Sequence, residues 1–411
     1  MTAILPLSAL GDVDWASLEH AYGEAVDVPE TLRAIAGGDP AQRAQARSWL
    51  HACLDHQGVQ RGEATLRAVP YLLGLIADAA VAERGAIAGL VAELAVGDTC
   101  WFLHDGFHPD LQPNPDDCAR AQHAAYLTGG DIQIRSFPSP GGSLDMTPGH
   151  GLRELYEAIA AGTPQLVAAL DDADPEVREG VAFLLGFLTT RADATAPALA
   201  RLLAADPEAR VRASAALGLS HAAKRSPSQR GVAEAALHEA WARGGSPLEQ
   251  RCVAMALVRL EDPAVSALVR PALAAWLADG VPPVMPPGFP WFRIDSAPLV
   301  FCTLYLGTDP AECDDVVAAA VRGLPRVVDP DDAVDLAVWI ARLAVPEPPR
   351  DAPDDATVAV AALPPSARAA LDALAGSEPA WSYSDTGRAL AGRGVPTARD
   401  ALRAWLDDAG G

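Results

Sequence analysis

Apolar residues recur at helical spacing along most of the chain, and between Asp174 and Ala222 the same pattern occurs twice in succession. The first copy reads DPEVREGVAFLLGFL from Asp174, and the second reads DPEARVRASAALGLS from Asp206, 32 residues further on. A repeat of this length made of helices indicates stacked units rather than one closed domain. The apolar stripe of the first copy, which lies on one face of a helix, consists of Val177, Val181, Leu184, Leu185 and Leu188.

Each copy opens with a signal for the start of a helix. The carboxylate of Asp174 or Asp206 suits the free N–H groups of a first turn, and the proline that follows suits the first helical position. A second helix is expected after Ala196-Pro197, with Leu199, Leu202 and Leu203 as its stripe. Because neither helix can bury its stripe alone, the pattern predicts an all-α fold, an α-solenoid of helix pairs. Val and Ile do not alternate with polar residues over any sizeable run, so we expect no substantial sheet.

Two irregular insertions interrupt the helical pattern. Residues 98–150 are rich in Pro, Gly, Asp and aromatic residues, apart from a short helix expected around Asp117–Leu127, and residues 280–296 are rich in proline. Long irregular segments in a compact array are typical of functional loops or disordered insertions. Elsewhere, helix starts are expected near Asp39-Pro40 and, with capping boxes, at Ser246 and Asp309. The predicted segments are an N-terminal cap (1–36), repeats (37–97), the first insert (98–150), repeats (151–279), the second insert (280–296), repeats (297–345), and a linker with a C-terminal helical cap (346–411).

The charge of the chain narrows the classes of partner. Fifty-four acidic residues stand against 31 basic residues, which gives a formal net charge of −23. Such a charge repels phosphate, so it disfavours nucleic-acid and anionic-membrane binding. The N-terminus lacks the basic residue of a signal peptide, no stretch approaches the roughly 18 apolar residues of a membrane span, and six scattered cysteines form no CxxC pair. We therefore expect a soluble cytoplasmic protein.

The DP-x-x-R helix starts and the paired amphipathic helices resemble HEAT repeats of the bacterial, lyase-associated (PBS-lyase-like) kind, specifically over Asp174–Ala222 and more loosely over residues 39–345. The HQG after the first helix, WFLHDGFHPDL from Trp101, LYEAIAAG, and AWSYSD…GVPTARDALRAWL from Ala380 are similar to a group of uncharacterised actinobacterial and myxobacterial HEAT-repeat proteins. The resemblance implies the fold. The wider HEAT class implies protein–protein scaffolding, with a minority of enzymes such as HEAT-like alkylpurine DNA glycosylases.

The first insert carries the strongest candidate chemistry. His104 and His108 are four residues apart, which on a helix places two imidazoles at metal-ligand spacing, and Asp105 lies between them. Gly106 and Pro109 indicate a loop instead, and neither an HExxH motif nor a zinc-like cysteine spacing is present. A structural or recognition loop is therefore the preferred interpretation, and we assign no metal ligand, cofactor or catalytic residue.

Two further kinds of residue are candidates for binding. His56 ends a helix, where an imidazole can cap free carbonyl groups; a catalytic role lacks an identifiable Ser or Cys nucleophile. Aromatic side chains in the inserts either fold back over the array or anchor a partner, as interface aromatics do. The candidate binding residues are His56, Trp101, His104, Asp105, Phe107, His108, Trp291 and Phe292.

Two classes of function follow from these patterns. The first is a non-enzymatic scaffold whose concave face and insert loops bind a protein partner, which the acidity of the chain suggests is basic. The second is an enzyme on the same scaffold, either a loop-borne metal-dependent hydrolase using His104 and His108 or a HEAT-like DNA glycosylase. A glycosylase would need a basic groove, which the net charge of −23 disfavours. The scaffold is the preferred prediction.

Overall fold

The computed structural model describes residues 4–55, 63–96, 150–224, 226–260, 263–281, 283–291, 296–306, 313–345 and 358–408. The chain divides into two compact units. The first holds the described residues up to 260 together with 286–291, and the second holds the other described residues. No helix in these ranges is both long and apolar enough to cross a membrane.

The first unit begins with an irregular, partly helical segment, as the sequence predicts. Two 3-10 turns precede a hairpin of two-residue strands, in which Glu19 pairs with Glu24 and His20 with Gly23. This hairpin is the only sheet among the described residues, so the expectation of no substantial sheet holds there. The elements are η1 (Leu7–Asp12), η2 (Trp15–Ser17), β1 (Glu19–His20), β2 (Gly23–Glu24), α1 (Val28–Gly37) and α2 (Pro40–Leu54).

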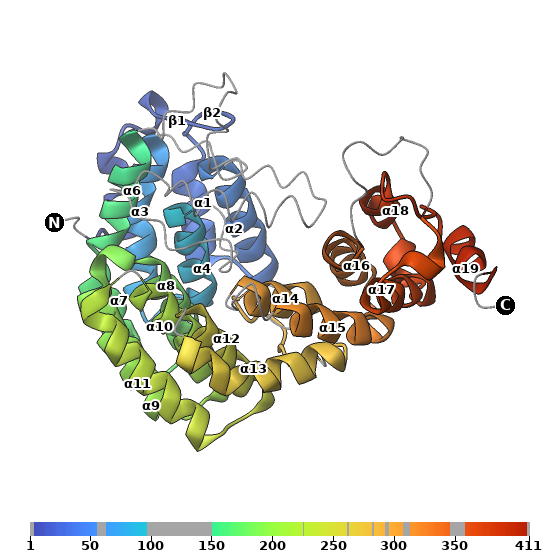
Figure 1. Cartoon of the computed structure of the whole chain (residues 1–411). Helices are drawn as coiled ribbons and strands as arrows, with labels where there is room; N and C mark the ends of the chain where they lie inside the picture. Colours follow the sequence, from blue (N-terminus) through green and yellow to red (C-terminus); the bar gives the residue numbers. More distant parts are fainter. Residues whose placement is uncertain are drawn as a thin grey trace. The chain divides into compact units, whose positions relative to one another are not determined.

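Helix pairs stacked in two layers make up the rest of the first unit (Figure 1). In one layer α4, α8, α10 and α12 contact one another in that order, and in the other α3 is followed by α7, α9 and α11. The bounds are α3 (Glu63–Ala77), α4 (Arg84–Val96), α6 (His150–Ala160), α7 (Thr163–Ala169), α8 (Pro175–Phe187), η3 (Thr189–Arg191), α9 (Ala192–Ala205), α10 (Ala209–Ala223), α11 (Pro227–Arg243) and α12 (Pro247–Arg259).

The layer of α4, α8, α10 and α12 forms the core of this unit. Every residue of α8 from Val177 to Phe187 is buried, as is most of α10. Close approach of the helix axes requires glycine: a Cβ on Gly180 would lie 2.3 Å from the carbonyl oxygen of Gly85 in α4. An alanine at either position would therefore force these helices apart.

The two sequence copies begin differently in the structure. Asp174 caps α8 as predicted, with Pro175 at the first position, and its side chain accepts the N–H of Glu176. The second copy does not start at Pro207: α10 begins two residues later, at Ala209. The carboxylate of Asp206 accepts the N–H of Glu208 and two bonds from Arg178, so it ties the repeats together as well as turning the chain.

Two other predicted helix starts also differ. Helix α9 begins at Ala192 rather than after Pro197, which lies inside the helix near its first turn and removes one backbone bond there. The predicted capping box at Ser246 is half formed. Ser246 accepts the N–H of Glu249, but the Glu249 carboxylate turns to Arg212 and Arg243. The capping box expected at Asp309 lies outside the described residues.

The second unit repeats the two-layer arrangement with α14 and α16 in one layer and α13, α15, α17 and α19 in the other. Its core centres on Trp339, which packs against Phe301 and Tyr305. The bounds are α13 (Pro263–Ala278), α14 (Ala297–Leu306), α15 (Cys313–Gly323), η5 (Leu324–Arg326), α16 (Pro330–Ala344), η6 (Val360–Ala362), α17 (Pro365–Gly376), η7 (Pro379–Trp381), α18 (Asp385–Leu390) and α19 (Arg399–Asp408). The molecule is thus an all-α solenoid, and the predicted fold class is confirmed. The boundaries of the predicted segments stay a prediction.

Candidate functional site

Most of the candidate binding residues belong to segments that the structure does not describe. His56, Trp101, His104, Asp105, Phe107, His108 and Phe292 all lie outside the described ranges. Their roles in binding, and the metal-dependent alternative that uses His104 and His108, stay predictions.

Trp291 is the candidate whose position is defined. Its side chain is fully buried and packs edge-on to Phe183, with ring centroids 4.8 Å apart, and roughly parallel to Phe187, at 5.8 Å. The indole N–H donates to the hydroxyl of Ser214 at 2.8 Å. A Cβ on Gly186 would lie 2.7 Å from the Cα of Gly218 in α10, so glycine at this position allows the close approach of the two helices that Trp291 covers. Trp291, in the stretch 286–291 of the second insert, therefore covers α8 and α10, and a partner could reach this side chain only after the stretch moved away.

A chain of ion pairs joins successive helix pairs of the first unit, and we call each helix pair a level of the stack. Arg84 donates twice to Asp172 (2.6 and 2.9 Å), and Arg178 donates twice to Asp206 (2.7 and 3.1 Å). At the next level Arg212 donates twice to Glu249 (3.0 and 2.7 Å). Arg178 and Arg212 each also donate to a backbone carbonyl of the preceding level, at Asp172 (2.8 Å) and Asp206 (2.7 Å). These paired groups connect the stack from α4 to α12.

These paired carboxylates hold the stack together, and Asp172 among them is not poised for acid–base chemistry. The hydrogen bonds from Arg84 hold the pKa of Asp172 below its usual value, although burial acts in the opposite direction. Asp172 is thus an ionised partner of a guanidinium. A carboxylate held ionised and doubly bonded is a poor proton donor.

An exposed aromatic cluster lies where the hairpin meets α2, and we call Tyr22, Val26, Asp27 and Trp49 the hairpin patch. The Tyr22 ring stacks on Trp49 with centroids 5.6 Å apart and an interplanar angle of 14°. The three apolar residues of the patch are strongly exposed: 55% for Tyr22, 57% for Val26 and 44% for Trp49. The indole N–H of Trp49 donates to Asp27 at 2.6 Å. The patch therefore presents apolar rings beside a carboxylate.

His20 fixes the position of this patch from beneath. Its Nδ1 faces the backbone N–H of Tyr22 at 3.1 Å, so Nδ1 accepts, and Nε2 carries the proton and donates to Asp27 at 2.9 Å. Burial raises the pKa of Asp27, but the bonds from Trp49 and His20 outweigh it, and the net shift is downward. Asp27 is therefore a fixed negative charge that holds two aromatic side chains in place.

His20, Asp27 and Cys53 come close enough to suggest a metal site, since their ligand atoms lie within 4.8 Å of one another. The two hydrogen bonds of His20 do not fit a metal site. A metal on Nε2 would leave a proton on Nδ1, which would then face the N–H of Tyr22. Burial, with a further effect of Asp27, raises the pKa of the Cys53 thiol to about 12, so the thiol is protonated and is not a nucleophile. This group is better explained as the structural base of the hairpin patch.

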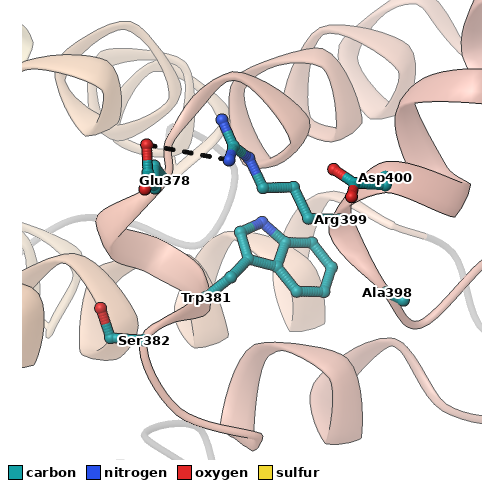
Figure 2. Close-up of a pocket in the computed structure, with 6 residues that line it drawn as sticks. All are labelled: Glu378, Trp381, Ser382, Ala398, Arg399 and Asp400. Carbon is teal, nitrogen blue, oxygen red and sulfur yellow. Dashed lines mark ion pairs between the residues drawn. The ribbon is translucent and has the colours of Figure 1, made fainter.

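The second unit contains an open pocket of about 400 Å³, lined by Glu378, Trp381, Ser382, Ala398, Arg399 and Asp400. Figure 2 shows the Arg399 guanidinium above the Trp381 indole and turned toward Glu378, from which it is separated by 3.9 Å. Both side chains also bond to backbone carbonyls of α17, Trp381 to Leu374 and Arg399 to Ala375. The pocket is a junction of α17, η7 and α19, and its contacts explain these residues without a ligand.

The stacked pairs of antiparallel helices place the protein in the class of helical-repeat proteins. Residues 157–220, which run from α6 to α10, match the family model of HEAT repeats. The crystal structure of an engineered protein from the Northeast Structural Genomics Consortium is similar at 17% identity over 97% of this chain and 90% of that chain. Its TM-score of 0.34 is too low to support an argument. No curated protein matches the sequence. The HEAT-repeat resemblance is thus supported, and the narrower bacterial group stays a prediction.

The hairpin patch was missed by the sequence analysis, although it left two signals. Tyr22 stands beside Gly23, a residue typical of turns, and Trp49 follows the helix start expected near Asp39-Pro40. On α2, Ala46, Leu50, Cys53 and Leu54 form the buried stripe, which leaves Trp49 on the flank. The six carboxylates of residues 4–32 are accompanied by no lysine or arginine.

Proposed function

We propose that the protein is a scaffold that binds another protein, and that the partner is basic. HEAT repeats commonly serve as scaffolds for protein interaction, and repeat arrays offer extended surfaces for this purpose. In the first unit Asp172, Asp206 and Glu249 are taken up by the ion pairs that connect the stack. Many other acidic residues remain, because the sequence has 23 more acidic than basic residues.

The observation that carries this proposal is the net charge of −23 on an array of helix pairs. A charge of this size attracts basic proteins and repels nucleic acids and acidic proteins. Screening limits the attraction to about 8 Å at physiological salt, so it steers the encounter while local contacts determine specificity. The insert loops and the concave face are the proposed contact surfaces. A partner that bound the surface of α8 and α10 beneath Trp291 would have to displace this residue.

The proposal is tested by capture with the full-length chain from a lysate of its source organism, followed by reconstitution with the purified captured protein. We expect one basic protein to bind at a fixed ratio, with an association rate that falls steeply as salt rises from 50 to 300 mM. The same assay is run on a variant of the chain in which two exposed acidic residues of the second unit, Asp372 and Asp407, are replaced by asparagine. Failure to reconstitute any complex, or a partner that is acidic, would overturn the proposal.

A further inference from the structure

The hairpin patch gathers exposed apolar area that is otherwise scattered. Of the eight large hydrophobic residues exposed in the described part of the chain, three are Tyr22, Val26 and Trp49. The other five come from separate elements, and single exposed apolar residues need no explanation. Clustered aromatic residues with polar surroundings are typical of binding surfaces.

The rings of the patch are held in place although they are exposed. Tyr22 is stacked on Trp49, faces the edge of His20 with centroids 6.4 Å apart, and is bound through its backbone N–H to His20. Trp49 is fixed by its bond to Asp27. A partner that covers these rings would lose little further freedom in them, so the surface is preorganised for binding.

The charge around the patch selects the chemistry of the occupant. Glu19 and Glu24, both exposed, lie directly opposite each other across the hairpin, and Tyr22 lies in the turn between them. Like charges in this position repel, and a cation from outside would relieve the repulsion. The two arginines of α2, Arg43 and Arg47, are bound to Glu83, and Arg33 of α1 is exposed. The hairpin patch therefore combines a flat aromatic surface with an excess of negative charge.

We propose that the hairpin patch binds an arginine side chain from an extended, basic segment of a protein partner, with the guanidinium plane stacked on the Tyr22–Trp49 pair. This inference rests on the proposed function, because it names the surface and the residue type through which a basic partner is recognised. Arginine fits better than lysine because its planar, weakly hydrated guanidinium stacks on aromatic rings, whereas the lysine ammonium is a compact, strongly hydrated charge.

The probes are two labelled twelve-residue peptides, one of alternating arginine and glycine and one of alternating lysine and glycine, titrated against the full-length chain at 100 mM salt. We expect the arginine peptide to bind about two- to fivefold more tightly than the lysine peptide. Tyr22→Ala should weaken the arginine peptide by about the same factor, and Tyr22→Phe should retain its affinity. The matched control is Tyr383→Ala, which removes a tyrosine that is 53% exposed in the second unit and should change nothing.

Three results would overturn the inference. Equal affinity for the two peptides, together with no effect of Tyr22→Ala, would show attraction by net charge alone. Binding weakened equally by Tyr383→Ala would place the peptide elsewhere. A wild-type dimer that Tyr22→Ala dissociates, measured by sedimentation, would make a second copy of the chain the occupant. Unchanged thermal unfolding of each variant is required for these comparisons.

The outcomes also separate this inference from the proposed function. If a captured partner binds Tyr22→Ala and the wild-type chain equally well, the hairpin patch is not its site, and the scaffold proposal stands. If the arginine peptide binds the patch but no protein partner can be reconstituted, the scaffold proposal fails and the recognition of arginine stands.

Discussion

Two tryptophans in the same compact unit show how differently one residue type is used. Trp291 is 0% exposed and lies among Phe183, Phe187 and glycine, whereas Trp49 is 44% exposed and lies under Tyr22. Each indole N–H has an oxygen acceptor, the neutral hydroxyl of Ser214 for Trp291 and the ionised carboxylate of Asp27 for Trp49. The first arrangement contributes apolar burial to folding. The second holds an aromatic surface rigid in water, which contributes little to folding and is useful for recognition.

The largest effect on stability is expected for the buried tryptophan, Trp291. Trp291→Ala should lower the free energy of unfolding of the first unit by about 3–5 kcal/mol, because it leaves a large cavity over α8 and α10 and removes the bond from the indole N–H to the Ser214 hydroxyl. Urea denaturation followed by circular dichroism measures the loss, with Trp291→Phe as a milder control that keeps part of the packing. An unchanged midpoint for the alanine variant would mean that Trp291 does not belong to the core.

The ion pairs between levels come next. Arg178→Ala removes both bonds to Asp206 and leaves a buried carboxylate without its main partner, so a loss of about 3 kcal/mol is expected. Arg201→Ala is the matched control, because its pair with Asp171 is exposed and should contribute less than about 1 kcal/mol. Equal losses in thermal unfolding for the two variants would contradict a structural role for the buried pair.

A smaller effect with a defined pH dependence is expected at two glutamates. The hydrogen bond from Arg43, partly opposed by burial and supported by Arg47, lowers the pKa of Glu83 below 4.5. Its stabilisation is therefore present above pH 4.5 and is lost as pH falls through the lowered pKa. Glu83→Gln should cost about 1–2 kcal/mol at pH 7. In urea denaturation, its difference from the wild-type chain should close as pH falls below 4.5.

The pKa of Glu179 is shifted in the opposite direction to that of Glu83, so the two glutamates are compared. Burial raises its pKa above 4.5, more than the hydrogen bond from Arg210 lowers it. The folded state thus favours the protonated form, and ionisation reduces stability as pH rises from 4.5 through the raised pKa. Glu179→Gln should leave the free energy of unfolding at pH 7 unchanged or slightly higher. A loss at pH 7 as large as that of Glu83→Gln would refute this assignment.

The smallest effect on folding is expected at the exposed end of the comparison. Tyr22→Ala should change the free energy of unfolding by less than about 0.5 kcal/mol, because the ring is more than half exposed. Thermal unfolding measures this change, and the same variant should lose affinity for the arginine peptide. A stability loss comparable with that of Trp291→Ala would make the hairpin patch part of the core instead of a binding surface.

The sequence predicted the repeats better than their junctions. The apolar stripe from Val177 to Leu188 and the cap at Asp174 predict α8 correctly, because both depend on local spacing. The start of α10 could not be predicted in the same way. Asp206 has the same local sequence as Asp174, but its carboxylate also bonds to Arg178, a residue 28 positions away. As a result, Arg212 rather than Arg210 takes the position in α10 that Arg178 has in α8.

The hairpin patch could be predicted only in part. The excess of carboxylates in residues 4–32 is visible in the sequence, but the stacking of Tyr22 on Trp49 depends on a two-residue hairpin that has no strand pattern. The sequence allowed two roles for the aromatic residues of the inserts, folding back over the array or anchoring a partner. The burial of Trp291 agrees with the first role. Which helices it covers depends on Phe183, Phe187 and Ser214, which no local pattern connects to the insert.

The position of Trp291 in the chain also bears on how the protein is made. Residues 286–291 belong to the first unit, while the described residues immediately before and after them belong to the second. During translation, α8 and α10 emerge long before Trp291, so the rings of Phe183 and Phe187 in a nascent first unit still lack the indole that packs on them. Completion of that unit must wait for synthesis of a segment beyond it, and in the interval these rings form an apolar surface that molecular chaperones can recognise.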